Sequence, residues 1–413
     1  MKICIAQTQS LKGNVQENIN NHLNIVKRAI KLNSDVIIFP ELSITGYEPK
    51  LAKKLAKTID NPIFNRFQDL SDKNQITIGI GMPTTSTDDI YISMLIFQPH
   101  IERVVYSKQL LHDDELPYFS GGTRQTFITI NETKIAFGIC YESLQRNHFI
   151  NAKQKGADIY IASVAKSKRG IEVAHNHFSN ISKEFNTPIL MSNSIGFCDN
   201  FLSFGKSAIW NKNGDLINLL DTENEGLLIY DTELESAEIH QLTIEKGKPS
   251  DLEILFQIYL NGKNDLEQIG IFQWTDNYPT RSIIKNDLKN GVLYILKKNN
   301  EIIGAINLSE EQETEYKSID WKFDDSKVLV IHRLVVNPKH QKLGYAKALV
   351  DFAECFAKDK NYTSIRLDAY SQNTRVIQFY KKRNYLIRGK VHFPERAHPF
   401  YCMEKELIPK GTA

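Results

Sequence analysis

The sequence predicts an α/β chain with two domains in series, on three observations. Its 413 residues are too many for one ordinary core, since domains usually run to about 100–250 residues. Short apolar runs alternate with segments of helical periodicity through the first half, which is typical of a layered α/β fold. A polar stretch follows residue 231, and the alternation then starts again.

The first half is expected to consist of short buried strands with helices between some of them. Residues 3–6 form a short apolar strand, and residues 16–32 carry apolar side chains at helical spacing. Continuous apolar runs, which suit strands buried on both faces, follow at 36–41, 76–81, 94–98, 134–140, 158–165, 188–194 and 226–231. Polar side chains at the ends of such strands are good candidates for chemistry.

The second half begins after the polar stretch 231–251, which we interpret as a linker. Its periodicity predicts helices at 251–261, 280–289, 343–357 and 373–383, and strands at 292–297, 302–308, 328–336 and 363–369. The two halves share no internal repeat. The fold class is therefore α/β, with two different domains.

Composition and cysteine content exclude several classes of protein. The formal charge of +2 gives no reason to expect nucleic acid or an anionic membrane as a partner. No stretch approaches the roughly 20 apolar residues of a membrane span, and the start MKICIAQTQS suits a strand better than a signal peptide. The five cysteines are few and widely spaced, which favours a reducing cytoplasm over a disulfide framework.

Three segments of the first half place a reactive side chain after a predicted strand. FPELSITGY carries Glu41, VVYSKQLLHDDE carries Lys108, and KIAFGICYES carries Cys140. A cysteine that attacks an amide carbon needs a base, a donor for the oxyanion and an acid for the leaving amine. A carboxylate, an ammonium and a thiol supply these roles. Each residue alone also suits packing or surface, and spacing alone does not bring the three together.

The same segments, in this order, closely resemble the nitrilase (carbon–nitrogen hydrolase) superfamily. We place this domain at residues 1–235. The resemblance implies an αββα sandwich that usually pairs with a second subunit. It also implies Glu41 as general base, Lys108 as oxyanion stabiliser and Cys140 as nucleophile. The backbone N–H of Tyr141 would be the second oxyanion donor, and the hydrolase would need no cofactor.

The resemblance also concerns further acids near these residues. Many family members carry a second Glu shortly after the Lys, and Glu115 in DDELPYF is the best match, with Asp113 and Asp114 as competitors. Glu142 either orients neighbouring groups or is a structural acid. Hydrolysis of an amide through a thioester is the expected reaction, because nitrile hydrolysis is a minority activity in this superfamily.

The segment SVAKSKRG, which would shape the substrate pocket, departs from the family pattern. Its basic residues are Lys166, Lys168 and Arg169. They either receive an acidic substrate or lie in a solvated loop, and we favour the solvated loop. The aromatic-Pro-Glu piece that often follows the cysteine motif is also replaced, here by SLQRNHF.

The second half carries a candidate phosphate-binding turn. In VLVIHRLVVNPKHQKLGYAKALV, a strand ends near Val336 and a short loop leads through Gln341, Gly344 and Ala346 into a helix. Small residues let the backbone approach a phosphate, and free N–H groups at a helix N-terminus bind it. An ordinary strand-to-helix turn would have the same pattern.

This segment, followed by SIRLDAYSQNTRVIQFYKKRNY, resembles the GNAT acetyltransferases, and we place this domain at 242–408. The resemblance implies acetyl-CoA as cofactor, direct attack by an amine and a pyrophosphate loop at 341–346. It implies that Asn373 contacts the cofactor and Tyr380 protonates the departing thiolate. The implied cofactor-binding residues are Leu334, Val336, Gln341, Gly344, Tyr345, Ala346 and Asn373.

The acceptor side of this second site is less defined. Trp274 and Tyr278 either line it or pack in the core. Candidates for its base are His332, His392, Glu395 and His398. No metal site is expected, either there or at HNHF (175–178), which suits a solvated helix better.

The leading hypothesis is a bifunctional enzyme that hydrolyses a small-molecule amide and acetylates a small-molecule amine, as a homodimer or higher homo-oligomer through the first domain. In one alternative only one half turns over. In another, the GNAT domain binds acetyl-CoA as a regulatory sensor without transfer. A third alternative is a non-catalytic scaffold.

Overall fold

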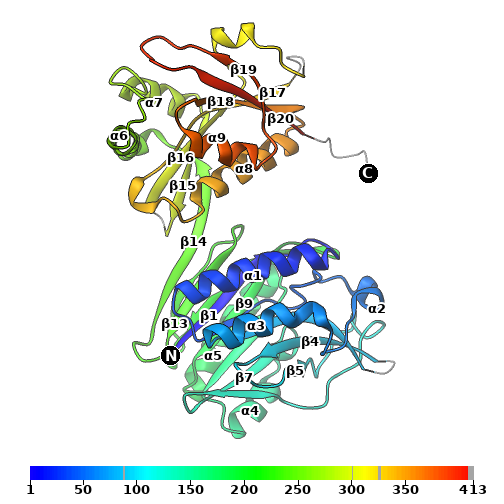
Figure 1. Cartoon of the computed structure of the whole chain (residues 1–413). Coiled ribbons are helices and arrows are strands. Elements are labelled where there is room, and N and C mark those ends of the chain that lie inside the picture. Colours follow the sequence, from blue (N-terminus) through cyan, green and yellow to red (C-terminus); the bar gives the residue numbers. More distant parts are fainter. Residues whose placement is uncertain (87–88, 300, 324–326, 408–413) are drawn as a thin grey trace. The chain divides into compact units, whose positions relative to one another are not determined.

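The computed structural model describes residues 1–86, 89–299, 301–323 and 327–407 (Figure 1). The chain divides into two compact units, and the boundary falls between Gln241 and Leu242. Each unit has its own sheet system and hydrophobic core, so each is described by itself.

The first unit contains two sheets. In one, β1 (Lys2–Gln9), β2 (Val36–Ile38) and β3 (Thr77–Ser86) are parallel, and β4 (Asp89–Phe97), β5 (Val104–Ser107) and β13 (Gly226–Asp231) extend it antiparallel. In the other, β7 (Thr133–Ile139), β8 (Ile159–Val164) and β9 (Ile189–Cys198) are parallel, and β6 (Phe127–Ile130), β11 (Ala208–Trp210) and β12 (Leu216–Leu219) extend it antiparallel. A hairpin joins β9 to β10 (Phe201–Phe204).

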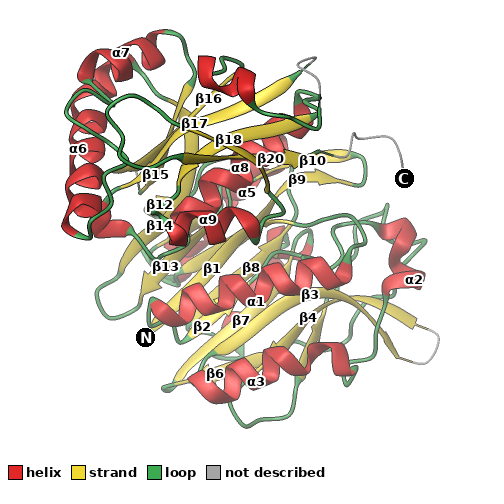
Figure 2. Ribbon diagram, turned by 45° about the horizontal axis from the view of Figure 1, so that its top comes forward, coloured by secondary structure: helices red, strands yellow, loops and turns green. Residues whose placement is uncertain are grey.

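The two sheets face each other, and helices cover their outer faces. Ile3 and Ile5 of β1 share one buried cluster with Ile135 and Phe137 of β7, between the sheets. Helices α1 (Val15–Lys31) and α3 (Asn65–Asn74) pack on the outside of the first sheet (Figure 2). Helices α4 (Arg146–Gln154) and α5 (Lys168–Phe185) pack on the second. Shorter helices are Pro49–Leu51, α2 (Ala52–Leu55), Pro62–Phe64 and Glu142–Leu144. The predicted αββα sandwich is confirmed.

This layering explains why the strands are continuously apolar. Successive side chains of a strand point to opposite faces. In β1, Ile3 and Ile5 enter the cluster between the sheets, whereas Cys4 and Ala6 enter the cluster beneath α1. Both faces are therefore buried, and the polar ends of the strands are left for chemistry.

The second unit is built on one sheet that begins with β14 (Ser236–Lys246) and has the order β14–β15–β16–β17–β18–β20–β19. The new strands are β15 (Leu293–Lys298), β16 (Glu301–Ser309), β17 (Val328–Val336), β18 (Ser364–Tyr370), β19 (Leu386–Val391) and β20 (Phe400–Glu406). Within this order, β17 and β18 run parallel, and the other neighbours are antiparallel. Helices α6 (Leu252–Gln268) and α7 (Arg281–Lys289) lie together on one face, and α8 (Tyr345–Asp359) and α9 (Thr374–Lys381) lie on the other (Figure 2). Short helices stand at Pro249–Asp251, Thr314–Ser318 and Pro338–His340.

Strands β17 and β18 separate partway along their length. Their register ends at the pair Ile331–Leu367, although β17 runs on to Val336. The other edge of β17 stays paired with β16 as far as Val336. The last part of β17 thus has backbone groups without a strand partner on the β18 side.

The polar stretch interpreted as a linker contains strand β14 (Ser236–Lys246). Its residues 236–241 pair with β13, and 242–246 pair with β15. Ile239 packs on the core of the first unit, whereas Leu242 and Ile244 pack on that of the second. Apolar side chains alternate with polar ones in each half of this strand, but the alternation shifts by one residue between Ile239 and Leu242, which concealed the pattern in the sequence. In the part of the chain that the structure describes, no helix is long and apolar enough to cross a membrane.

Candidate active sites

The first candidate site centres on a buried lysine between two carboxylates. Lys108 follows β5, and its Nζ donates to Glu41 Oε1 at 2.9 Å and to Glu115 Oε1 at 2.6 Å. All three side chains are almost fully inaccessible to solvent. Glu41 follows β2, so residues far apart in the sequence meet at one end of the first sheet.

The geometry separates Glu115 from the neighbouring acids. Glu115 accepts further hydrogen bonds from the Tyr47 hydroxyl at 2.9 Å and from the backbone N–H of His112 at 2.8 Å. Asp113 and Asp114 are exposed, and Asp114 pairs with the His112 ring instead. Of these three acids, Glu115 is the one in contact with Lys108.

Burial controls the charges of this cluster. It raises the pKa of the Glu41 carboxyl to about 7, even though the Lys108 ammonium opposes the shift. Burial disfavours the charge on Lys108, but Glu41, Cys140 and Glu115 outweigh it and raise the pKa of this ammonium. Among the described residues, Glu41 Oε2 has no hydrogen-bond partner. One oxygen of Glu41 is held by the lysine, and the other is available to a proton.

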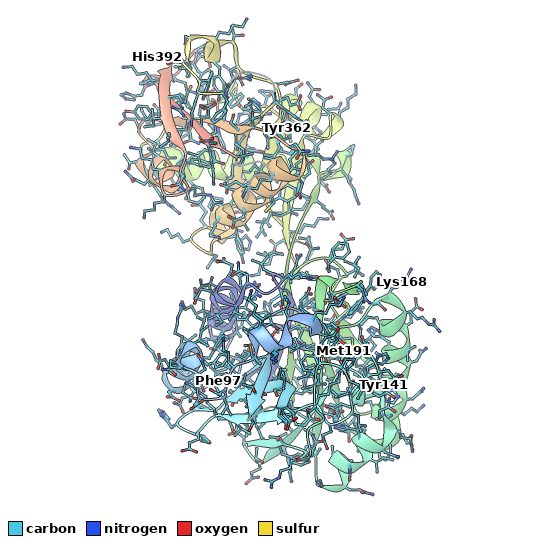
Figure 3. All side chains as sticks on the ribbon, turned by 90° about the vertical axis from the view of Figure 1, so that its right-hand side faces the viewer. Phe97, Tyr141, Lys168, Met191, Tyr362 and His392 are labelled. Atoms are coloured by element: carbon cyan, nitrogen blue, oxygen red, sulfur yellow. The ribbon has the colours of Figure 1, made fainter. Side chains whose placement is uncertain are left out.

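Cys140 stands at the turn that follows β7. Its φ of +44° lies in the left-handed region, which non-glycine residues rarely adopt. Its N–H donates to Ser163 O of β8 at 3.0 Å, which holds this conformation. The next N–H, that of Tyr141 (labelled in Figure 3), makes no hydrogen bond among the described residues. Burial and the Glu41 charge raise the pKa of the Cys140 thiol to about 11, whereas Lys166 and Lys108 oppose this shift.

Our interpretation of Lys166 as part of a solvated loop is wrong. The residue is 6% exposed, and its Nζ lies 3.7 Å from Cys140 Sγ. Lys168, labelled in Figure 3, and Arg169 are exposed in the first turn of α5. The sequence did not separate the three because burial of Lys166 depends on a contact with Asn193, whose Oδ1 accepts the Lys166 N–H at 2.9 Å.

Glu142 is a fully buried acid that ties two parts of this site together. Its Oε2 accepts the backbone N–H groups of Gln109 and Leu110, at 2.6 and 3.2 Å. Its Oε1 accepts the Ile139 N–H at 2.7 Å and the Tyr106 hydroxyl at 2.6 Å. Of the two roles left open for Glu142, the contacts favour the orienting one.

The HNHF segment lies on α5. His175 is partly buried against the Trp210 ring. Within the described residues, no group of three or more His, Cys, Asp or Glu side chains is arranged to hold a metal ion.

The second candidate site is a cavity of about 870 Å³ in the second unit. It lies where β17 and β18 separate, between Leu334 of one and Asp368 of the other. The structure brings all the expected cofactor residues and Tyr380 to its walls: Leu334, Val336, Gln341, Gly344, Tyr345, Ala346, Asn373 and Tyr380.

The start of α8 forms one end of this cavity. Gly344 caps the helix with a φ of +85°, a conformation that favours glycine. The first intrahelical bond is donated by Ala348 to Gly344 O at 3.1 Å, so the N–H groups of Tyr345, Ala346 and Lys347 are unpaired within the helix. These groups, with no Cβ on Gly344, fit the phosphates of a nucleotide cofactor.

Tyr380 and Asn373 are both buried in the cavity wall. Burial raises the pKa of the Tyr380 phenol, so its hydroxyl is protonated at neutral pH. The Asn373 side chain caps α9 by accepting the Val376 N–H at 3.3 Å, and it donates to Gln273 Oε1 at 3.0 Å. Its side-chain contacts are therefore made within the protein.

The other end of the cavity contains several acids. Trp274, Tyr278, His332 and Glu395 line the cavity, but His392 does not, and His398 lines an adjoining hollow that shares Trp274 and Glu395 with the cavity. Asp368 and Glu313 also line it, and the sequence reasoning missed both. Burial raises the pKa of Asp368 to about 6, and the Tyr316 hydroxyl donates to it at 2.8 Å. The only sequence signal for Asp368 was a polar residue within the strand SIRLDAY.

Comparison with known families gives one match in each half of the chain. The carbon–nitrogen hydrolase family model matches residues 2–239, and the chain belongs to this family. The GNAT acetyltransferase family model matches residues 259–385. The protein is thus a carbon–nitrogen hydrolase domain followed by a GNAT domain.

Several curated relatives and solved structures match about half of the chain. The glutamine-dependent NAD(+) synthetase of Acinetobacter baylyi is 25% identical over 233 residues, which are 52% of this chain and 41% of that protein. The probable nitrilase C965.09 of Schizosaccharomyces pombe is 25% identical over 240 residues, 54% of this chain and 85% of that protein. A variant of the amidase from Nesterenkonia sp. AN1, solved with butyramide, has a TM-score of 0.52 and 18% identity over 57% of this chain and 92% of that chain. This last likeness shows a shared fold.

Proposed function

We propose that the first unit hydrolyses a small amide through a thioester on Cys140, and that the second transfers an acetyl group from acetyl-CoA to an amine. The observation that carries the first part is the buried Glu41–Lys108–Glu115 cluster, whose charges act on the Cys140 thiol. The unpaired edge of β17 beside the N-terminus of α8 carries the second.

In the hydrolase reaction, Glu41 takes the proton of the Cys140 thiol. The sulfur attacks the amide carbon, and the carbonyl electron pair moves onto oxygen. The ammonium of Lys108 and the N–H of Tyr141 stabilise this oxyanion, since donors aimed at developing charge are typically worth about 3–4 kcal/mol each. The raised pKa of Glu41 suits a group that must both take and return a proton near neutral pH.

Collapse of the tetrahedral species breaks the C–N bond, and the amine leaves with the proton from Glu41. Water then gives a proton to Glu41 and attacks the thioester, and the C–S bond breaks to return the thiolate. Glu115 does not touch the reacting atoms in this scheme. It holds Lys108 in place, together with the Tyr47 hydroxyl.

Trapping of Cys140 tests the hydrolase proposal. A glutamate-to-leucine mutant of the Nesterenkonia amidase took up the acetamide moiety of fluoroacetamide at its active-site cysteine, so fluoroacetamide is a suitable first probe. We expect mass spectrometry of the treated protein to find a single adduct, on Cys140. The exposed Cys355 is the internal control, and equal labelling of the two cysteines would count against the proposal.

In the transferase reaction, acetyl-CoA would supply a thioester whose acetyl group an amine attacks. The backbone of Leu334 and Val336 would pair with the pantetheine arm as an added strand, and the free N–H groups of α8 would bind its pyrophosphate. Tyr380 would protonate the departing thiolate. Asp368, ionised above about pH 6, would receive the proton of the amine.

Acetyl-CoA consumption with a panel of small amines tests the transferase proposal. We expect free CoA to be released only when an amine is present, and Tyr380→Phe to retain cofactor binding while losing most transfer. If no amine is acetylated but acetyl-CoA changes the amidase rate, the second unit is a sensor. If the chain does not bind CoA at all, the cavity has been misassigned.

We also infer a homodimer through the first unit, as is usual in the family. Large apolar side chains are exposed on its β9–β10 hairpin, with Phe197 82% and Leu202 51% accessible. Such side chains support self-association. Analytical ultracentrifugation tests this, and a monomer at micromolar concentration would contradict it.

A further inference from the structure

Lys166 is a buried cation that points at the proposed nucleophile. Lys166 is the second residue after the end of β8, and its Nζ donates to Cys140 Sγ at 3.7 Å. Since β7 and β8 are adjacent parallel strands, their ends bring Cys140 and Lys166 together at the same edge of the sheet.

No described carboxylate is in direct contact with the Lys166 ammonium, and its charge acts on Glu41 only from beyond ion-pair distance. Among the described residues, no carboxylate oxygen lies within ion-pair distance of its Nζ. A buried charge without a partner costs several kcal/mol, so buried cations are normally paired with an anion. The group that its Nζ contacts, and that can become such an anion, is the sulfur of Cys140.

The backbone of Lys166 is held firmly in this position. Its N–H donates to Asn193 Oδ1 at 2.9 Å, and its carbonyl oxygen accepts the Phe204 N–H at 2.9 Å. The same carbonyl accepts weaker bonds from Asn193 Nδ2 at 3.4 Å and Ser203 Oγ at 3.3 Å. A residue fixed from two neighbouring strands offers a preorganised charge rather than a flexible surface one.

We propose that Lys166 is a further catalytic residue of the hydrolase, which stabilises the thiolate form of Cys140. This inference rests on the proposed function of the first unit. The positive and negative charges of the cluster then balance throughout the reaction. With Lys166 included, two ammonium groups face two carboxylates while the thiol is neutral, and the same total holds after Glu41 has taken the thiol proton.

The proton transfer moves one proton from Sγ to Glu41 and leaves the electron pair on sulfur. The charge then sits between Lys166 and Lys108 instead of on the carboxylate. The same contact acts again when the C–S bond of the thioester breaks and its electron pair returns to sulfur. Without Lys166 the cluster would carry an uncompensated negative charge in both steps.

Several other titratable groups lie around Lys166 and Cys140. Glu41 raises the pKa of the Cys140 thiol, and Lys108 lowers it from the β5 side. Glu115 and Tyr47 lie behind Lys108, and the charge of Lys166 also acts on His177 of α5. Of the charges on the thiol, that of Lys166 is the stronger of the two that favour the thiolate.

The pH dependence of Cys140 alkylation by iodoacetamide tests this proposal on the thiol itself, without a measurement of amide turnover. We compare the full-length protein with Lys166→Met and Lys166→Arg, and follow the site by mass spectrometry. Lys166→Met should slow alkylation at neutral pH by at least about tenfold, because one pKa unit corresponds to a tenfold loss of thiolate. Lys166→Arg should retain most of the rate.

Lys168→Met is the matched control, because it removes an exposed cation two residues away. Its alkylation profile should match that of the unaltered protein. Circular dichroism shows whether each variant folds, and the rate at high pH shows whether Cys140 stays accessible. If Cys140 of the Lys166→Met variant is alkylated with the same pH profile as in the unaltered protein, the proposal is wrong. This holds even if the variant hydrolyses a different set of amides. If Cys140 of the unaltered protein is itself inert, the proposed hydrolase function fails instead.

Discussion

Glu142 Oε2 lies 2.6 Å from the backbone nitrogen of Gln109, and this hydrogen bond joins the turn beside Cys140 to the residue after Lys108. The carboxylate is fully buried and also accepts the Ile139 N–H. The relative position of nucleophile and ammonium therefore depends on an acid that touches neither of them.

We predict that Glu142→Gln lowers the amidase rate and destabilises the first unit. In the glutamine side chain an NH2 donor would replace one of the two acceptor oxygens. The loss matters because hydrogen bonds to a charged group are worth about 1.5–3 kcal/mol each. The melting temperature of the first unit and the kcat of the amidase should both fall. Glu172→Gln, on the exposed face of α5, is the control, and equal effects of the two changes would contradict the assignment.

Glu115→Gln should reduce amidase activity by about tenfold or more, because breaking a buried ion pair costs roughly 3–5 kcal/mol and releases the Lys108 ammonium. Asp114→Asn changes a nearby exposed acid and should leave kcat/KM unaltered. Comparing the two variants shows whether the effect requires contact with Lys108 or only closeness to it in the sequence. The opposite order of effects would assign the role to Asp114.

The amidase rate should fall as the pH is lowered through about 7. Glu41 acts as a base only when ionised, and burial raises its pKa to about 7; below that value the carboxyl is protonated and cannot accept the thiol proton. We would measure kcat/KM between about pH 5.5 and pH 8.5, with circular dichroism to exclude acid unfolding. A rate that stays constant down to pH 5.5 would show that another group is the base.

Gly344→Ala should weaken CoA binding by about tenfold, because a left-handed conformation costs a non-glycine residue roughly 1–2 kcal/mol. The residue has a φ of +85° at the start of α8. Gly270→Ala is the control, since Gly270 has a φ of +76°, open space around its Cα and no place in the cavity wall. Isothermal titration should find normal affinity in the control. Equal weakening in both variants would point to a general loss of stability.

Asp368→Asn should retain CoA affinity but lower the rate of acetyl transfer by about 10²-fold, the range typical of a lost general base. In the unaltered protein, transfer should decline below about pH 6, where the carboxylate becomes protonated. Glu315→Gln, which changes another acid at the same cavity, should have a smaller effect. A larger loss in Glu315→Gln would move the role to that residue.

The sequence alone was sufficient for the fold class and for the residues carried by recognisable segments. Strands such as β1 and helices such as α1 follow from local periodicity, because the spacing of apolar side chains is set by the backbone. Strand β14 was missed because charged residues fill its exposed positions. Glu41, Lys108 and Cys140 were identifiable because each stands in a family-specific segment.

The tertiary structure decided the features that depend on residues distant in the chain. Lys166 and Lys168 are both lysines of one polar segment, and only the packing of Asn193 and β10 against the first leaves one buried and the other exposed. Asp368 became a candidate base because β17 and β18 separate beside it. Burial and its effect on charge arise from long-range contacts, which local sequence does not encode, so the surroundings of Cys140 were known only once the strands were in place.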